Sequence, residues 1–285
     1  IRTNDNFYKE MLGIALPITL QNLIANSVNM LDTLMITSLG EKNLAAVGFA
    51  NQVFFLYAVT IFGIATGSSV FIAQFWGKKD KRNIRRVIGL SLTLSTILGI
   101  IFTATALFVP ERIMKIFSQE TEVINLGVEY LSIVVFSYIL TGISFTFAVA
   151  SRSIGHAKMP MVVSIISFVT NGVFNYLLIF GKFRFPKLGI KGAAYGTLIA
   201  RVVEILLILY AVYSDTTSPL AGNIHELTDW DKNFARKYFS TTYPVIINEA
   251  LWSLGNVMYS IAYAKIGTEA AASVQILNTI YNLFM

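Results

Sequence analysis

Apolar runs long enough to cross a bilayer, about 20 residues each, recur along this chain and are separated by short polar segments. Lipid offers the backbone no hydrogen-bonding partners, so spanning segments of this kind are helical. The pattern therefore predicts an all-α integral membrane fold with eight transmembrane helices, near residues 11–38, 48–76, 87–109, 123–150, 160–181, 191–213, 238–264 and 269–285. The last of these runs is still apolar at Met285.

Composition agrees with this pattern. Hydrophobic residues make up 55% of the 285 positions and charged residues 13%, and the mean hydropathy is +0.63. A soluble domain could not bury that much apolar surface. The sequence contains no cysteine, which excludes disulfides and thiolate metal sites. The net charge of +6 resides in short loops, where basic residues set membrane topology, so we predict no nucleic-acid partner.

The loop at 77–86 carries six basic residues against one acid, Asp80, which predicts that this loop and the N-terminus are cytoplasmic. With that orientation, 13 Lys and Arg residues fall inside and 8 outside. Four of the 8 lie at 182–191, in a loop expected outside, so the asymmetry is incomplete.

An internal repeat relates the two ends of the chain. A shift of 227 residues aligns Pro17 with Pro244 and Gly40 with Gly267. The same shift superimposes two polar stripes, each on one helical face, namely Asn22, Asn26, Asn29 and Thr33 on Glu249, Ser253, Asn256 and Ser260. Because an even number of spans separates the copies, they form a parallel repeat.

The repeat predicts a domain organisation. Residues 1–213 form a six-helix lobe, 214–236 a cytoplasmic linker between lobes, and 237–285 the first two helices of a second lobe. A duplicated six-helix unit implies about 12 transmembrane helices in the full protein.

Ionisable residues inside predicted spans are the candidate functional groups, because an unpaired charge in hydrocarbon is costly. Asp32 adjoins the first polar stripe and Glu249 heads the second, so we favour a functional role for both over a structural acid or a helix-end acid. Arg201 and Glu204 have i, i+3 spacing and are interpreted as a structural ion pair. Glu129 is expected at the membrane interface.

Other polar and small residues recur at helical spacing. A third stripe, Ser164, Ser167, Asn171 and Asn175, either lines the cavity of Asp32 or bonds one helix to another. Glycine pairs at 63 and 67 and at 192 and 196 indicate close helix packing. Pro17 and Pro244 are expected to kink their helices near the polar stripes.

Several motifs are absent from the sequence. There is no G-x-x-x-x-G-K-[ST] loop, so the chain itself does not hydrolyse ATP and any transport would use an ion gradient. There is also no H-E-x-x-H or G-x-S-x-G motif, and His156 and His225 fall in loops. These observations favour a transporter over an enzyme.

Several local sequences resemble the multidrug and toxic compound extrusion (MATE) family, and the likeness covers essentially the whole chain. They include Ala15-Leu16-Pro17, Met30-Leu31-Asp32-Thr33, Ala73-Gln74-Phe75-Trp76-Gly77 before the basic loop, Arg152-Ser153-Ile154-Gly155-His156, Asn175-Tyr176-Leu177-Leu178-Ile179-Phe180-Gly181 and Gly192-Ala193-Ala194-Tyr195-Gly196-Thr197. The resemblance implies a twelve-helix antiporter of two lobes that exports organic, often cationic compounds in exchange for sodium ions or protons.

Residues can be matched to the family by position. Asp32 corresponds to the family's first-helix acid, and Glu249 to the seventh-helix glutamate of sodium-coupled bacterial members. Asn171 and Asn175 fall where some members carry Asn-x-x-x-Asp, so this chain lacks the second carboxylate and Asp32 is the clearest titratable group of the first lobe. Glu249 is a possible sodium ligand that would need further oxygen ligands.

We therefore predict a secondary antiporter of the inner (plasma) membrane, whose partners are a small organic substrate, a sodium ion or proton, and the bilayer. It needs no cofactor beyond the coupling ion. Asp32 and Glu249 are the ion-coupling candidates, and the expected cavity-lining residues are Asn22, Asn26, Asn29, Thr33, Asn171, Asn175, Ser253 and Asn256.

Two alternatives stay open at this point. A lipid-linked sugar flippase of the same broad fold would want a larger basic cavity, and Arg201 is the only interior base. A membrane-embedded transferase acting through Asp32 would want a second carboxylate or a histidine nearby.

Overall fold

A computed structural model describes residues 5–215, 218–267, 269, 273–274 and 276–278. The helices in this part of the chain are α1 (Asp5–Thr37), α2 (Glu41–Gly77), α3 (Lys81–Phe108), α4 (Pro110–Phe117), α5 (Thr121–Val134), α6 (Phe136–Ser153), α7 (Lys158–Phe180), α8 (Ile190–Ser214), α9 (Ile224–Thr228) and α10 (Lys232–Ile266). The described residues contain no strand, as the all-α prediction requires.

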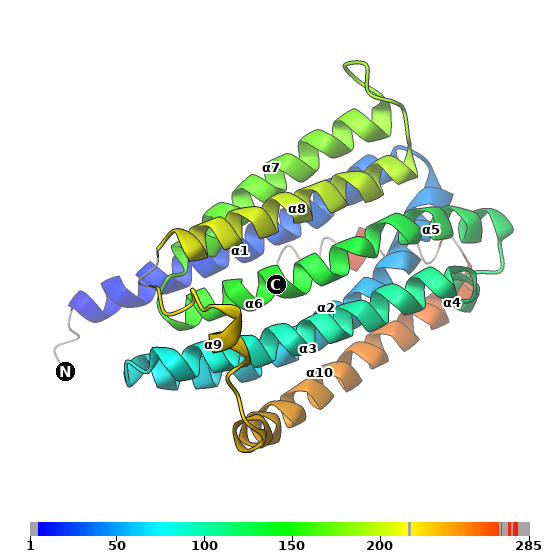
Figure 1. Cartoon of the computed structure of the whole chain (residues 1–285). Coiled ribbons are helices and arrows are strands. Elements are labelled where there is room, and N and C mark those ends of the chain that lie inside the picture. Colours follow the sequence, from blue (N-terminus) through cyan, green and yellow to red (C-terminus); the bar gives the residue numbers. More distant parts are fainter. Residues whose placement is uncertain (1–4, 216–217, 268, 270–272, 275, 279–285) are drawn as a thin grey trace.

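The long helices lie side by side in one bundle, and the loops gather at its two ends (Figure 1). Helix α7 packs mainly on α8 and α1, whereas α10 packs along α2 on the other side of the bundle. Two apolar cores hold the bundle together. One is centred on α2, α5 and α6, and includes Tyr57, Tyr138 and Leu131, while the other lies nearer the α2–α3 turn.

Five of the eight expected spans have candidates among the described residues. By length and composition, α2, α3, α7 and α8 could each cross a membrane, and α5 with α6 makes a fifth candidate that bends by 48° between them. Helix α1 covers the expected span 11–38 except for its last residue and α10 contains the expected span 238–264, yet neither meets this criterion over the described residues. Most of the expected span 269–285 lies outside the described residues.

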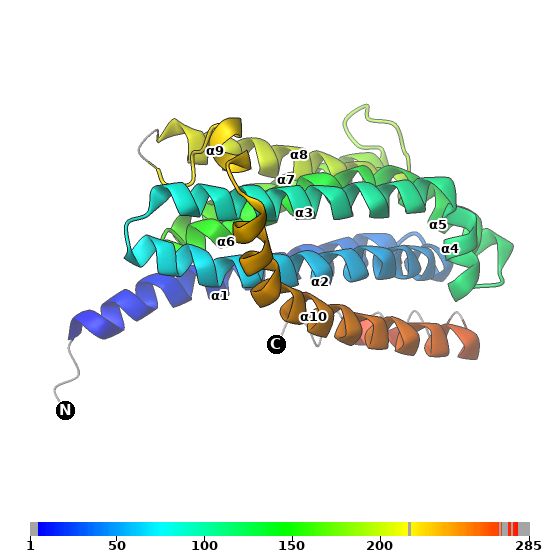
Figure 2. The same ribbon diagram turned by 60° about the horizontal axis from the view of Figure 1, so that its bottom comes forward.

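Both glycine pairs mark close helix packing, as predicted. A Cβ atom on Gly63 would lie 2.9 Å from the backbone of Ile246, and one on Gly67 would lie 2.4 Å from the Thr242 side chain. The contact with α10 thus surrounds Pro244. Both α1 and α10 continue through their prolines, and Figure 2 shows α10 changing direction partway along its length. A proline removes one helical hydrogen bond and crowds the preceding turn, which accounts for such a bend.

The predicted linker is docked against α3. Asp229, the residue after the short helix α9, pairs with Arg82 and Arg86 at nitrogen–oxygen distances of 2.8 and 3.0 Å. Glu226 within α9 pairs with Arg85 at 2.5 Å. The hydrogen bond from Arg82 and the two arginine charges hold the pKa of Asp229 below its ordinary value. The ion pairs of Asp229 with Arg82 and Arg86 form a clamp between the linker and α3. This clamp stays charged at neutral pH and weakens only as the pH falls through that lowered pKa.

Close approach of the backbone completes this clamp. A Cβ atom on Gly89 would lie 1.7 Å from the carbonyl oxygen of Leu227, whereas one on Gly77 would meet nothing within 4 Å. We expect Gly89→Ala to push α9 off α3 and to raise amide hydrogen exchange at residues 224–229 at least about tenfold, because the local opening energy falls. Gly77→Ala is the matched control. Equal exchange in both variants would contradict the docking of α9.

Candidate functional site

Asp32 is the centre of a polar cluster formed by α1, α7 and α8. The Asn175 side-chain amide donates to Oδ1 of Asp32 at 2.5 Å, and the same nitrogen lies 3.3 Å from Oδ1 of Asn171. Asn171 in turn donates to Oγ1 of Thr197 at 3.5 Å. Three helices thus meet in one hydrogen-bonded chain.

Local sequence explains why these groups meet. Asn171 and Asn175 are four residues apart, so they lie on the same face of α7. Gly196 lets α8 approach that face, since a Cβ atom there would lie 2.0 Å from Oδ1 of Asn175. Gly192 approaches the backbone of Leu178 in the same way. The glycine pair of α8 therefore sets the position of Asn175, which in turn holds Asp32.

Charge is balanced across the cluster by α8. Arg201 lies one turn beyond Thr197 on the same face, forms an ion pair with Glu204 at 2.5 Å, and also attracts Asp32 electrostatically. The pair was predicted from its spacing, but its place beside Asp32 was not. With Asp32 ionised, two carboxylates and one guanidinium leave one net negative charge, which suits a single cation.

The cluster has a further hydroxyl and a spare acceptor. The buried Tyr130 of α5 lies close to Thr197, which joins a fourth helix to the site. Oδ1 of Asn175 is buried and accepts no hydrogen bond from the described residues. A buried polar atom of this kind is costly unless a bound group pairs with it.

The third polar stripe bonds one helix to another along its length, and its lining of a cavity stays a prediction. Asn171 and Asn175 are buried at the Asp32 cluster. The other two members bond between helices, because Ser167 donates to the Ala200 carbonyl at 3.2 Å and Ser164 accepts from Gln21 at 3.0 Å.

The described side chains of the first stripe, on α1, are less buried than Asn171 and Asn175. Asn22 is exposed, and Asn26 and Thr33 are half-buried, each with interactions of its own. The side chain of Asn29 lies outside the described residues. Their lining of a cavity therefore stays a prediction.

The second stripe lies on α10 and bonds largely within its own helix. Ser253 donates to the Ala250 carbonyl at 3.0 Å, Asn256 to the Trp252 carbonyl at 2.8 Å, and Ser260 to the Asn256 carbonyl at 3.3 Å. Glu249 is half-buried. The described residues contain no group of three Asp, Glu, His or Cys side chains that could hold a metal ion, so a sodium site at Glu249 stays a prediction.

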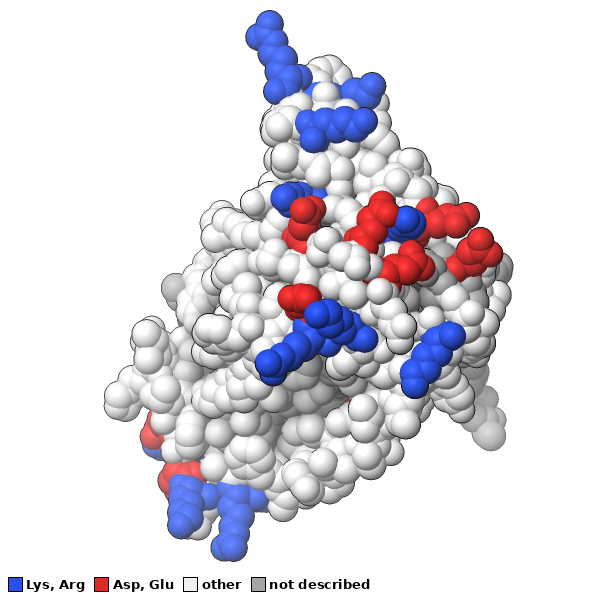
Figure 3. Space-filling model, turned by 90° about the vertical axis from the view of Figure 1, so that its right-hand side faces the viewer, with Lys and Arg blue, Asp and Glu red and all other residues white. Residues whose placement is uncertain are grey.

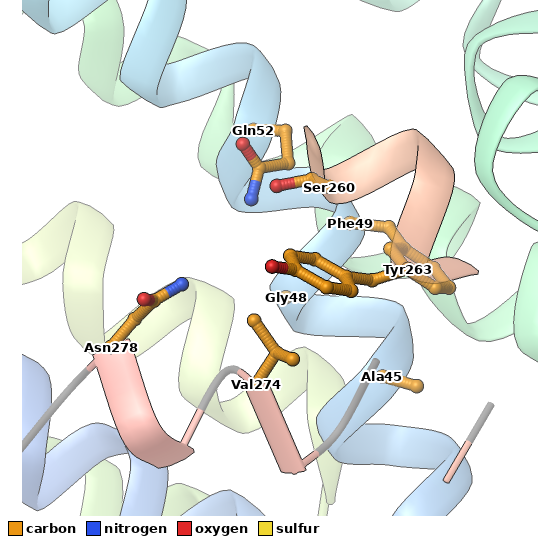
Figure 4. A pocket seen from close by; sticks show the side chains of 8 residues that line it. All are labelled: Ala45, Gly48, Phe49, Gln52, Ser260, Tyr263, Val274 and Asn278. Atoms are coloured by element: carbon orange, nitrogen blue, oxygen red, sulfur yellow. The ribbon is translucent and has the colours of Figure 1, made fainter. Parts of the chain in front are cut away.

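A small pocket lies at the far end of the second stripe. Figure 4 shows Ser260 and Gln52 close together at its rim, with Tyr263 and Asn278 also lining it. Its volume of about 20 Å³ has room for one water molecule. The structure does not bring Glu249 and Asp32 together, since α10 packs along α2 whereas α1 packs mainly on α7.

Sequence reasoning missed Tyr130 and Thr197. One signal was present for Thr197, because it precedes Arg201 by four residues and so shares its helical face. Tyr130 had no such signal, since its role depends on how α5 packs against α8. The neighbouring Glu129 is exposed and lies 3.5 Å from Lys191, as expected for an interfacial acid.

The fold and this interior cluster define a helical membrane protein of the transporter type. The MatE family model matches residues 17–177, more than half of the chain, and the chain therefore belongs to the MatE family. Members of this family are transporters rather than enzymes.

Curated relatives support the assignment. The "Probable multidrug resistance protein NorM" of Thermotoga maritima is 27% identical over 93% of this chain and 56% of its own length. The "Probable multidrug resistance protein YoeA" of Bacillus subtilis is 27% identical over 98% of this chain and 61% of its own length. The chain thus spans about three fifths of these relatives.

Solved structures show the same fold. An inward-facing multidrug resistance MATE family transporter of the MOP superfamily superimposes with a TM-score of 0.77 and 22% identity, covering 94% of this chain and 60% of the other. An outward-facing transporter of the same description gives 0.78 and 21%, covering 96% and 65%.

Proposed function

We propose that this chain supplies ion- and substrate-binding residues of a secondary antiporter that exports organic, cationic compounds in exchange for sodium ions or protons. The observation that carries the proposal is the Asp32 cluster, a carboxylate held by Asn175 inside a lobe of this family. Uptake of a fluorescent cationic dye into inverted vesicles, with sodium and pH gradients imposed separately, tests it. The assay uses a protein that includes this chain and is as long as its relatives. Absence of gradient-driven uptake for every dye of a panel would contradict the proposal.

The cluster supports an exchange mechanism. A cation at Asp32 would be stabilised by the carboxylate, and a proton or sodium ion would satisfy the same charge, so each would displace the other. Asn175 keeps the carboxylate in place, while the Arg201–Glu204 pair limits the site to one net negative charge. In a two-lobed protein, rocking of one lobe against the other would open the site first to one side of the membrane and then to the other.

The alternatives fit the arrangement less well. A flippase for an anionic head group would want free positive charge, but Arg201 is already paired with Glu204 at 2.5 Å. A transferase is disfavoured because the family consists of transporters.

Glu249 is proposed as a separate ion-coupling residue of α10. A hard cation needs carboxylate oxygen, whereas an aromatic dye can be held by apolar walls. We expect Glu249→Gln to reduce the sodium or proton dependence of transport at least about tenfold at subsaturating ion, with dye affinity changed less than about threefold. Transport rates and dye binding in matched preparations measure both quantities. Unchanged ion dependence would place coupling in the first lobe alone.

We also propose that the end of the bundle carrying the α2–α3 turn faces the cytoplasm of an inner (plasma) membrane. Figure 3 looks onto the opposite end, where Lys and Arg gather at the top and the rest of the face shows Asp and Glu interspersed with further Lys and Arg. An excess of Lys and Arg is characteristic of cytoplasmic loops, so a face with mixed charge is consistent with the external side of the membrane.

The orientation can be tested with single cysteines in this cysteine-free sequence. We expect an impermeant maleimide added to intact cells to label Lys187→Cys and to leave Lys78→Cys unlabelled until the membrane is permeabilised, since both positions are exposed on opposite ends. Labelling of Lys78→Cys in intact cells would reverse the assignment.

A further inference from the structure

A second cavity lies far from Asp32, where α10 begins. It has a volume of about 320 Å³ and lies between α2, α3 and the first turns of α10. Figure 2 shows this part of α10 crossing α3 and α2. Ligand pockets begin at about this size.

Aromatic rings form the walls of this cavity. Phe75 stacks on Phe234 with centroids 6.4 Å apart, and Phe71 lies 5.8 Å from the Tyr238 ring. Tyr238 is itself fixed, because its hydroxyl lies 2.6 Å from Oγ of Ser68. The walls are therefore apolar and held in place.

Positive charge lies at the same cavity. Arg86 lines it, sits 5.7 Å from the Phe234 ring, and shares its charge with Asp229 at 3.0 Å. Lys237 also lines the cavity, is exposed, and has no ion-pair partner among the described residues. Asn83 donates one amide hydrogen to the Asp80 carboxylate at 2.6 Å and has a second amide hydrogen available as a donor. One positive charge is thus left unbalanced beside an aromatic wall.

The depth of the cavity fits the lipid head-group region. Asn83 and Arg86 belong to the first two turns of α3, and Lys237 to the second turn of α10, so each lies within about 10 Å of a helix end. Trp76, near the end of α2, is 39% exposed, and exposed Trp residues are typical of membrane interfaces. Basic pockets between helices at this level bind anionic lipid head groups.

We propose that this cavity is a binding site for an anionic phospholipid. The phosphate would accept hydrogen bonds from Lys237 and Asn83, and the start of an acyl chain would lie against Phe75 and Phe234. Such a lipid would join α10 to the α2–α3 turn.

Native mass spectrometry of the purified chain in a nonionic detergent tests this site, with phosphatidylglycerol and phosphatidylcholine added separately. We expect one phosphatidylglycerol to be retained preferentially, and Lys237→Gln to reduce that preference about fivefold, as for loss of one basic residue at a membrane surface. Lys237→Arg should retain it. Lys232→Gln is the matched control, since Lys232 is also exposed on α10 but does not line the cavity.

The outcomes separate the possible ligands. Equal retention of the two lipids, or an equal loss in the Lys232→Gln control, would overturn the proposal. Displacement of the lipid by millimolar inorganic phosphate would assign the site to a free anion and would also overturn it. Retention of phosphatidylglycerol in excess phosphate supports the lipid.

Discussion

Asp32→Asn is expected to abolish gradient-driven efflux while the protein remains folded and inserted. The amide keeps the size of the carboxylate and one acceptor oxygen, to which Asn175 can still donate. What is lost is the charge that would attract a cation and exchange it for a proton or sodium ion. We expect the transport rate to fall at least about a hundredfold, because one unit charge at an effective dielectric of about 20 is worth several kcal/mol at close range.

Dye efflux from proteoliposomes measures this loss, with thermal stability in detergent as a check on folding. Glu129→Gln is the matched control, since it removes an exposed carboxylate of the same lobe that lies at Lys191 rather than at the cluster. Efflux at the wild-type rate from the Asp32→Asn protein would show that Asp32 has a structural role and no role in coupling.

The Arg201–Glu204 pair should show opposite effects when its members are removed one at a time. Glu204→Gln frees Arg201 to pair with Asp32, so the cluster becomes neutral and its affinity for a cationic dye should fall at least about tenfold. Arg201→Gln leaves two carboxylates, so the affinity should rise and dye release should slow. The double variant regains the single net negative charge and should bind within about threefold of the wild type.

Equilibrium dye binding at low ionic strength measures this series, because salt screens the effect. The double variant serves as the internal control, since it contains both substitutions. Dye binding by the double variant as weak as in Glu204→Gln, or no gain of affinity in Arg201→Gln, would show that the pair does not set the charge at Asp32.

The helical fold and the position of Asp32 within the first long helix were predictable, because both depend on short-range sequence patterns. Apolar runs and the i, i+4 spacing of Asn171 and Asn175 are visible in sequence, and both glycine pairs packed helices as expected. The structure shows the carboxamide at position 175 bonding to Asp32 at 2.5 Å, so the residue that departs from the family pattern is part of the cluster.

Contacts between distant segments were not predictable. Thr197 and Tyr130 join the cluster because α8 and α5 pack beside α7 and α8, and no local period encodes that arrangement. The sequence predicted a polar linker at 214–236. In the structure Asp229 and Glu226 attach this linker to α3, because they pair with arginines more than 130 residues earlier in the chain. Charge pairs at that separation cannot be assigned from one sequence.

In the mechanism proposed for this site, a cation bound at Asp32 competes with the coupling ion. The most direct test is the dissociation constant of a cationic dye measured across sodium concentration and pH, in the wild type and in Asp32→Asn. We predict that a plot of log Kd against the logarithm of the coupling-ion concentration loses about one unit of slope in the variant, since one exchangeable charge has been removed. An unchanged slope in Asp32→Asn would contradict the claim.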